Sequence, residues 1–176
     1  MMTKLPLVIF WLASATVALW LSGCGLDGGE VKLSINEVMA SNTATLADEE
    51  GEYDDWIELF NDGEQELDLE GYFISDDEED AFKKRLPAGL VVPAKGTLLL
   101  WADSDPEQGP AHLPFKLKAE GETISLTSPE GEAIDGLSFG GSIEDQVFGR
   151  YPDAEGEFAL CSTPTPNKVN GDACAD

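Results

Sequence analysis

An acidic segment of the chain carries residue types that could bind a metal ion. Residues 48–55 read Asp-Glu-Glu-Gly-Glu-Tyr-Asp-Asp. Hard cations such as calcium take several oxygen ligands from a flexible loop around a glycine, so the segment predicts a calcium site. The candidate ligands are Asp48, Glu50, Glu52 and Asp55. Two of them are glutamates, whose longer side chains fit a compact cage less well, so a solvated acidic loop is the alternative.

The sequence offers little for catalysis. Catalysis of the Ser-His-Asp or Cys-His kind needs a base beside the nucleophile, and His112, in the proline-flanked stretch 109–114, is the only histidine. We interpret it as a histidine at the surface or at a strand edge. A catalytic zinc ion needs more ligands than one histidine and a pair of bridged cysteines supply, and glycine-rich phosphate-binding loops are absent. We therefore predict that the protein is not an enzyme.

The N-terminus has the order of an export signal, with a positive charge at Lys4, an apolar run over residues 5–21 and then small residues. The run is shorter than the roughly 20 apolar residues of a spanning helix. Residues 21–24, Leu-Ser-Gly-Cys, resemble a bacterial lipobox, which implies that Cys24 is acylated and becomes the mature N-terminus. Because Gly25 and not an aspartate follows, we expect a lipid anchor in the outer membrane of a bacterial cell envelope. An ordinary secretory signal and an uncut signal anchor are the alternatives.

Two further cysteines, Cys161 and Cys174, form an even pair in an exported chain. Because that compartment permits oxidation, we predict a disulfide between them, with two free thiols as the alternative. Closing a loop of this size contributes about 3 kcal/mol in the chain-entropy model. The bridge would therefore fasten the C-terminus.

The chain is strongly acidic. Its 35 acidic residues outnumber 10 basic ones, which gives a formal net charge of −25 at pH 7. Removal of residues 1–23 would also remove Lys4, one of the ten basic residues. Such a field repels phosphate backbones and favours cations and cationic surfaces, so we expect no nucleic acid partner. A second acidic run, residues 76–80, is interpreted as solvated surface.

Short segments in which apolar and polar residues alternate follow from Val31 onward and predict strands. Gly, Pro, Asp and Asn separate them at turns, and no convincing helix is indicated. In residues 55–61, Ile57 and Leu59 share one face and Glu58 lies on the other. We therefore expect strands with one buried and one solvated face, in an all-β sandwich of about seven to nine strands.

Seven motif blocks occur in an order that resembles one family. The blocks are Ile35–Val38 with Ser41-Asn42, Asp55–Asn61, Gly71–Asp76, Leu86-Pro87 through Leu98–Ala102, Phe115–Leu117 with Gly121-Glu122, Phe148–Asp153, and Ser162–Asn167. Together they resemble the lamin-tail domain, an immunoglobulin-like β-sandwich found in nuclear lamins and in many bacterial exported proteins. The resemblance covers residues 33–167. The acidic loop also resembles the bacterial lamin-tail pattern Asp-x-Asp-Gly-Asp-x-x-Asp-Trp, with glutamates in place of two aspartates.

The sequence therefore predicts three parts, namely a lipoprotein signal peptide (1–23), a lipid tether (24–30) and a lamin-tail-like β-sandwich domain (31–176). We expect a non-catalytic binding or scaffolding module, anchored to the membrane by its lipid, that docks an envelope protein or a polysaccharide. The alternatives are a calcium-dependent enzyme or enzyme accessory domain, and a carbohydrate-binding module. The last rests on four aromatic residues that could stack on sugars, Trp56, Trp101, Tyr53 and Tyr151.

Overall fold

The computed structural model describes residues 31–174. The predicted signal peptide, Cys24 and the tether lie outside the described residues. Within residues 31–174, no helix is long and apolar enough to cross a membrane. The described chain is almost entirely β-structure, and it ends in one short 3₁₀ helix, η1 (Gly171–Cys174).

Twelve strands make up the described part of the chain. They are β1 (Leu33–Met39), β2 (Asp55–Asn61), β3 (Leu67–Asp68), β4 (Phe73–Ser75), β5 (Lys84–Arg85), β6 (Val91–Val92), β7 (Gly96–Ala102), β8 (His112–Leu113), β9 (Thr123–Thr127), β10 (Ala133–Ser138), β11 (Phe148–Tyr151) and β12 (Glu157–Leu160). Eight of these have three or more residues, which agrees with the predicted seven to nine strands.

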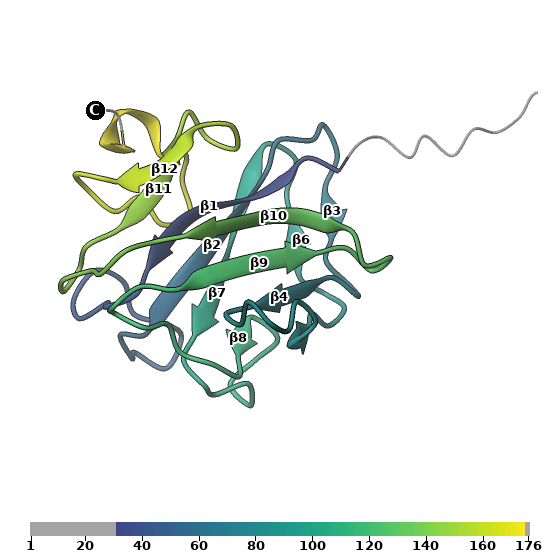
Figure 1. Cartoon of the computed structure of the whole chain (residues 1–176), viewed down its shortest axis with the longest axis horizontal. Coiled ribbons are helices and arrows are strands. Elements are labelled where there is room, and N and C mark those ends of the chain that lie inside the picture. The colour runs from purple at the N-terminus through teal and green to yellow at the C-terminus, as the bar shows by residue number, and fades with distance from the viewer. Residues whose placement is uncertain (1–30, 175–176) are drawn as a thin grey trace, which may run out of the picture.

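Two sheets pack face to face as a sandwich (Figure 1). The larger sheet has the strand order β12-β11-β1-β2-β7-β8, and the smaller one has the order β10-β9-β4-β5. Strands β3 and β6 pair separately. Neighbours in the larger sheet are antiparallel except β7 and β8, which are parallel. The prediction of an all-β, immunoglobulin-like β-sandwich is confirmed.

The main core lies between the two sheets and consists of aliphatic and aromatic side chains. Ile57 and Leu59 of β2 are fully buried in it, as their alternation predicts. The same cluster contains Ile74 of β4 and Leu126 of β9 from the opposite sheet. Because each fully buried side chain of this size contributes about 1.5–3 kcal/mol, this core is the main source of stability for the sandwich.

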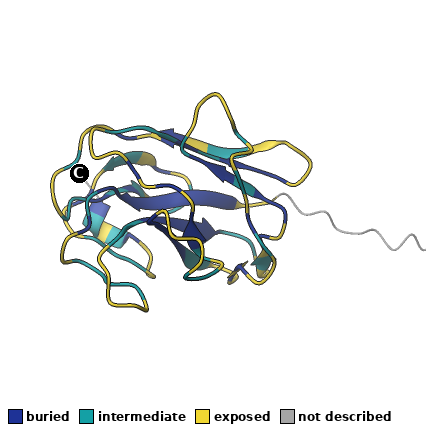
Figure 2. Cartoon of the chain, turned by 90° about the horizontal axis from the view of Figure 1, so that it is seen from below, coloured by how far each residue is buried: buried dark blue, intermediate teal, exposed yellow. Residues whose placement is uncertain are grey.

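The opposite face of β2 is not solvated, so the expectation of a wet outer face is wrong for this strand. Trp56 and Glu58 on that face are fully buried. A second apolar cluster covers it and combines Trp56 and Trp101 with Cys161 and Cys174. The C-terminal chain therefore folds back over the outer face of the larger sheet. Figure 2 shows the resulting contrast between buried strands and exposed loops.

A β-bulge in β1 determines which side chains reach this outer face. Ile35 pairs with Leu59, but the next pair is Glu37 with Glu58, so Asn36 is the extra residue. A bulge shifts the alternation by one residue, and without it Glu37 would point toward the core between the sheets. The bulge thus places the two glutamates next to each other on the outer face.

Candidate functional site

The predicted calcium loop folds around the side chain of Asp48. Asp48 Oδ1 accepts hydrogen bonds from the backbone N–H groups of Glu50, at 2.9 Å, and Glu52, at 2.8 Å. Gly51 has a φ of 86°, a left-handed conformation that favours glycine. The other oxygen, Asp48 Oδ2, is buried and has no hydrogen-bond partner in the described chain. The loop therefore presents one buried carboxylate oxygen with unused acceptor capacity.

The loop between β7 and β8 brings a buried imidazole to the same region. Asp103 follows β7 and His112 begins β8, and their side chains are 3% and 5% exposed. His112 Nδ1 is hydrogen-bonded to Asp103 Oδ2, while Asp103 Oδ1 accepts a bond from the Asp105 N–H at 2.8 Å. His112 Nε2 lies 3.6 Å from Glu49 Oε2. Burial lowers the pKa of His112, but Asp103 and Glu49 outweigh burial, so the pKa is raised.

These two loops form two overlapping groups of possible metal ligands. One ligand atom each of Asp48, Asp103 and His112 lies within 4.8 Å of the others, and the same is true of Asp48, Glu52 and Asp54. The second group contains only carboxylates. Because Asp48 belongs to both groups, the two are alternative sites that share one ligand.

The structure brings together two of the four predicted calcium ligands. Asp48 and Glu52 lie in the carboxylate group. Glu50 is exposed, and Asp55 begins β2, where it accepts a hydrogen bond from the Asn42 N–H at 3.3 Å. Burial raises the pKa of Asp55 to about 6. Glu50 and Asp55 lie outside both groups, and calcium binding itself stays a prediction.

Sequence reasoning missed Asp103 and His112 as members of this site. The interpretation of His112 as an edge residue agrees with the structure, because β8 is the last strand of the larger sheet. Its placement at the surface is wrong, because the side chain is buried. The parallel pairing of β8 with β7 sets Trp101 opposite His112 and brings the imidazole near Asp103. No local pattern in the sequence signals that pairing.

Within residues 31–174, the hydrogen bond and the ion pair of the His112 imidazole both go to carboxylates, so neither nitrogen is hydrogen-bonded to a serine or cysteine. A Ser-His or Cys-His arrangement is therefore not assembled within the described chain. This geometry suits proton or cation binding instead.

A second polar cluster surrounds Glu37 and Glu58, which are both fully buried. Thr165 donates to Glu37 Oε1 from its backbone N–H at 3.0 Å and from its hydroxyl at 2.9 Å. Asn167 donates from its backbone N–H to Glu58 Oε2. The segment 162–170 therefore lies across both glutamates and is held by them.

The two glutamates bind protons more tightly than ordinary carboxylates do. Burial raises the pKa of Glu37 to about 7. Burial, together with the negative charge of Glu37, raises the pKa of Glu58 to about 8. Glu58 Oε1 is also buried without a hydrogen-bond partner in the described chain. Near neutral pH the pair is therefore partly protonated.

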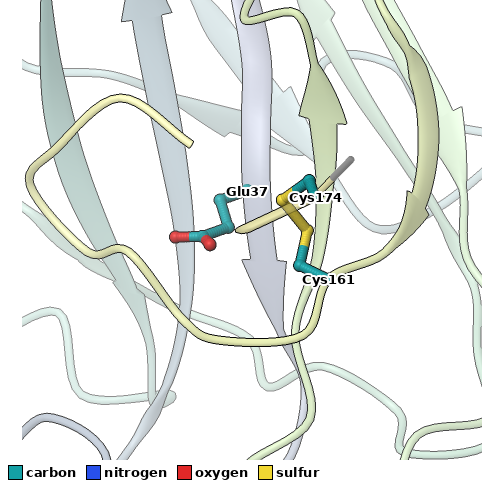
Figure 3. Close-up of side chains that lie close together, drawn as sticks. All are labelled: Glu37, Cys161 and Cys174. Carbon is teal, nitrogen blue, oxygen red and sulfur yellow. A yellow bond between two sulfur atoms is a disulfide. The ribbon is translucent and has the colours of Figure 1, made fainter. Parts of the chain in front are cut away.

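The predicted disulfide between Cys161 and Cys174 is present, and Figure 3 shows it beside Glu37. The three residues lie close enough together to suggest a metal site, but two sulfurs bonded to each other cannot act as thiolate ligands. Gly149 makes room for this packing, because a Cβ there would lie 2.8 Å from Asn170 Nδ2 and 2.9 Å from each sulfur. The cluster fastens the C-terminal chain.

Two of the four candidate sugar-stacking residues belong to the core. Trp56 and Trp101 are 0% and 5% exposed and pack in the outer-face cluster. Tyr53 and Tyr151 are 50% and 42% exposed. Of these four residues, the tyrosines are therefore the ones available at the surface.

The two packed sheets and the disulfide define the class of protein, an immunoglobulin-like β-sandwich whose C-terminal chain is held by a disulfide. The family model described as Lamin Tail Domain matches residues 29–141, and the chain belongs to this family. A search of curated proteins returned no match. The matched range contains the acidic loop, His112 and both buried glutamates, whereas the disulfide and the segment over the glutamates lie beyond it.

Proposed function

We propose that this chain is a lipid-anchored, non-catalytic protein of the bacterial cell envelope whose lamin tail domain binds a partner protein. Family membership carries the binding role in this proposal, because the lamin tail domain is an immunoglobulin-like module of the interaction type, whereas the anchor rests on the lipobox-like residues 21–24. The two polar clusters are compatible with this role. In the first cluster His112 is hydrogen-bonded to the carboxylate of Asp103, and in the second Glu37 holds the C-terminal segment at Thr165.

The charge of the chain favours a partner with a basic surface. Acidic residues outnumber basic ones by 35 to 10. Complementary charge raises the association rate and discriminates against wrong partners. Binding energy in interfaces comes mainly from large side chains that become buried. The exposed side chains that could act in this way are Tyr53, Phe82, Ile143, Tyr151 and Leu160.

The proposed anchor would keep the sandwich close to the membrane. Strand β1 begins at Leu33, nine residues after Cys24. An extended chain covers about 3.4 Å per residue, so this tether reaches about 30 Å at most. A partner would therefore have to lie in the same membrane or next to it.

Photo-crosslinking in living cells tests this proposal. A photoreactive amino acid replaces Tyr53, Phe82 or Tyr151 in the full chain, and mass spectrometry identifies what is captured. We expect one recurrent protein with a basic surface, and we expect its capture to fall in a Cys24→Ser variant that keeps the same surface. Hydrolysis of phosphoester or glycan substrates by the purified chain, or selective binding on a glycan array without a protein partner, would overturn the proposal.

A further inference from the structure

We propose that Asp48 and His112 bind a divalent transition-metal ion, with zinc as the representative ion, and that Asp103 orients the imidazole through its hydrogen bond to Nδ1. The site joins the acidic loop to the loop between β7 and β8. It differs from the predicted calcium site because it uses a nitrogen ligand and because two of its three residues lie outside residues 48–55.

The separation of Asp48 and His112 is close to that of two ligands of a single ion. Zinc binds imidazole nitrogen and carboxylate oxygen at about 2.0–2.2 Å in a tetrahedral arrangement, so two of its ligand atoms are about 3.4 Å apart. The ligand atoms of Asp48, Asp103 and His112 lie within 4.8 Å of one another. A closure of at most about 1.4 Å therefore brings the Asp48 and His112 ligand atoms to this separation.

One buried oxygen at the site lacks a partner, and one buried imidazole nitrogen has only a long contact. The His112 side chain is 5% exposed, and its Nε2 atom faces Glu49 Oε2 at 3.6 Å, which is longer than a hydrogen bond. Asp48 Oδ2 is buried without a hydrogen-bond partner in residues 31–174. A buried polar atom left unpaired costs about 1–3 kcal/mol, so a bound cation would relieve this cost. Backbone N–H groups hold Asp48 Oδ1, which leaves Oδ2 as the free oxygen.

The local charge also favours a cation. The carboxylates of Asp48, Asp103 and Glu49 surround a single imidazole. The Glu49 side chain is 78% exposed, so it can move to close the site from the solvent side. Imidazole is a common ligand of zinc and other transition metals, whereas calcium and magnesium prefer oxygen ligands only. The imidazole therefore assigns this site to a transition metal, and the group Asp48, Glu52 and Asp54 is the oxygen-only competitor.

The single histidine of the chain gives a direct readout. The full chain is purified in detergent without a histidine tag, labelled with ¹⁵N-histidine and titrated with zinc, calcium or magnesium. We expect zinc to bind at one ion per chain and to shift the imidazole nitrogen resonances. Equal concentrations of calcium or magnesium should leave these resonances in place.

Four variants separate the possible sites. His112→Asn and Asp48→Asn should each weaken zinc binding at least tenfold, and Asp48→Asn changes no residue of the buried Asp103–His112 pair. Glu52→Gln alters only the oxygen-only group, and Glu79→Gln removes an exposed carboxylate elsewhere. Both should bind zinc as the wild type does. The proposal is overturned if zinc leaves the His112 resonances unchanged, or if Asp48→Asn binds zinc like the wild type. It is also overturned if Glu52→Gln rather than His112→Asn abolishes binding.

Discussion

Glu37 and Glu58 hold their carboxyl groups where water does not reach them, on neighbouring strands of one sheet. Two ionised carboxylates in such a place lose hydration and repel each other, so protonation of either one is favoured. Hydrogen bonds donated by Thr165 and Asn167 offset part of this effect. Asp153 adds a further negative charge near both glutamates. The proton occupancy of the pair is thus linked to the docking of the C-terminal segment.

The raised pKa values predict that stability falls as the pH rises. Both glutamates have an ordinary pKa of 4.5 and folded values of about 7 and about 8, so the folded state binds more protons than the unfolded state between these limits. Their contribution is complete below pH 4.5 and is lost as the pH rises through 7 and 8. Urea unfolding at pH 6 and pH 9 should show a decrease in the free energy of unfolding on the order of a few kcal/mol.

A Glu58→Gln variant is the control for this pH dependence, because glutamine has nearly the same shape and does not ionise. The variant should lose clearly less stability than the wild type between pH 6 and pH 9. His112, whose pKa is also raised, contributes in the same direction in both proteins, so it does not obscure the comparison. Equal pH dependence of variant and wild type would show that the glutamate pair is not responsible.

Among the elements, β11 is connected to both sheets through Arg150. Its Nη2 atom donates to Asp135 Oδ1 at 3.0 Å and Oδ2 at 3.1 Å, on β10 of the smaller sheet. Its Nε atom donates to the Ile35 carbonyl of β1, and Nη1 donates to the Gly156 carbonyl, both at 2.9 Å. The planar guanidinium is suited to such a divergent set of acceptors. One side chain therefore ties the C-terminal hairpin to the edge of the opposite sheet.

Replacing Arg150 with methionine should lower the free energy of unfolding by about 2–4 kcal/mol, because Asp135 then keeps its charge without its cationic partner. Chemical denaturation at pH 7 measures the change. Arg85→Met on β5 is the matched control, since Arg85 is exposed and its loss should change stability by less than about 0.5 kcal/mol. Similar losses in the two variants would show that the contacts of Arg150 contribute nothing specific.

The disulfide closes the C-terminal element, and its two cysteines are 13 positions apart in the sequence. Reduction should lower the melting temperature and cost about 3 kcal/mol, which is less than the 5–15 kcal/mol of a typical domain, so the fold should persist. Circular dichroism with and without reductant measures this. In the native, unreduced chain neither cysteine should react with an alkylating agent, and prompt labelling of both would contradict the bridge in solution.

For the whole molecule, the sandwich carries its own core, so the anchor and the fold should be separable. A Cys24→Ser variant should leave the membrane fraction while its β-rich circular dichroism spectrum and melting temperature stay unchanged. Fractionation of cells with detergent partitioning checks the first part of this expectation. Retention of the variant in the membrane fraction would show that another segment holds the chain there.

Local patterns in the sequence were sufficient for the architecture and for half of the predicted metal ligands. The alternation of Ile57 and Leu59 identifies a strand with a core face, and both residues are buried as expected. The acidic run identifies Asp48 and Glu52 as neighbours across Gly51. In each case the residues concerned are only a few positions apart, so the strand period or the turn residues are enough to predict their arrangement.

The sequence by itself determined that this chain forms an all-β sandwich with a bridged C-terminus, because strand period, turn residues and cysteine count are local or compositional properties. The lamin-tail type followed from the resemblance of its motif blocks to that family. Only the tertiary structure decided that the outer face of β2 is buried, that Glu37 lies beside Glu58, and that His112 joins Asp48. These arrangements depend on a bulge and on contacts between distant residues, such as Thr165 with Glu37 across 128 positions. A period of two cannot reveal them, because a single inserted residue reverses the face of a side chain.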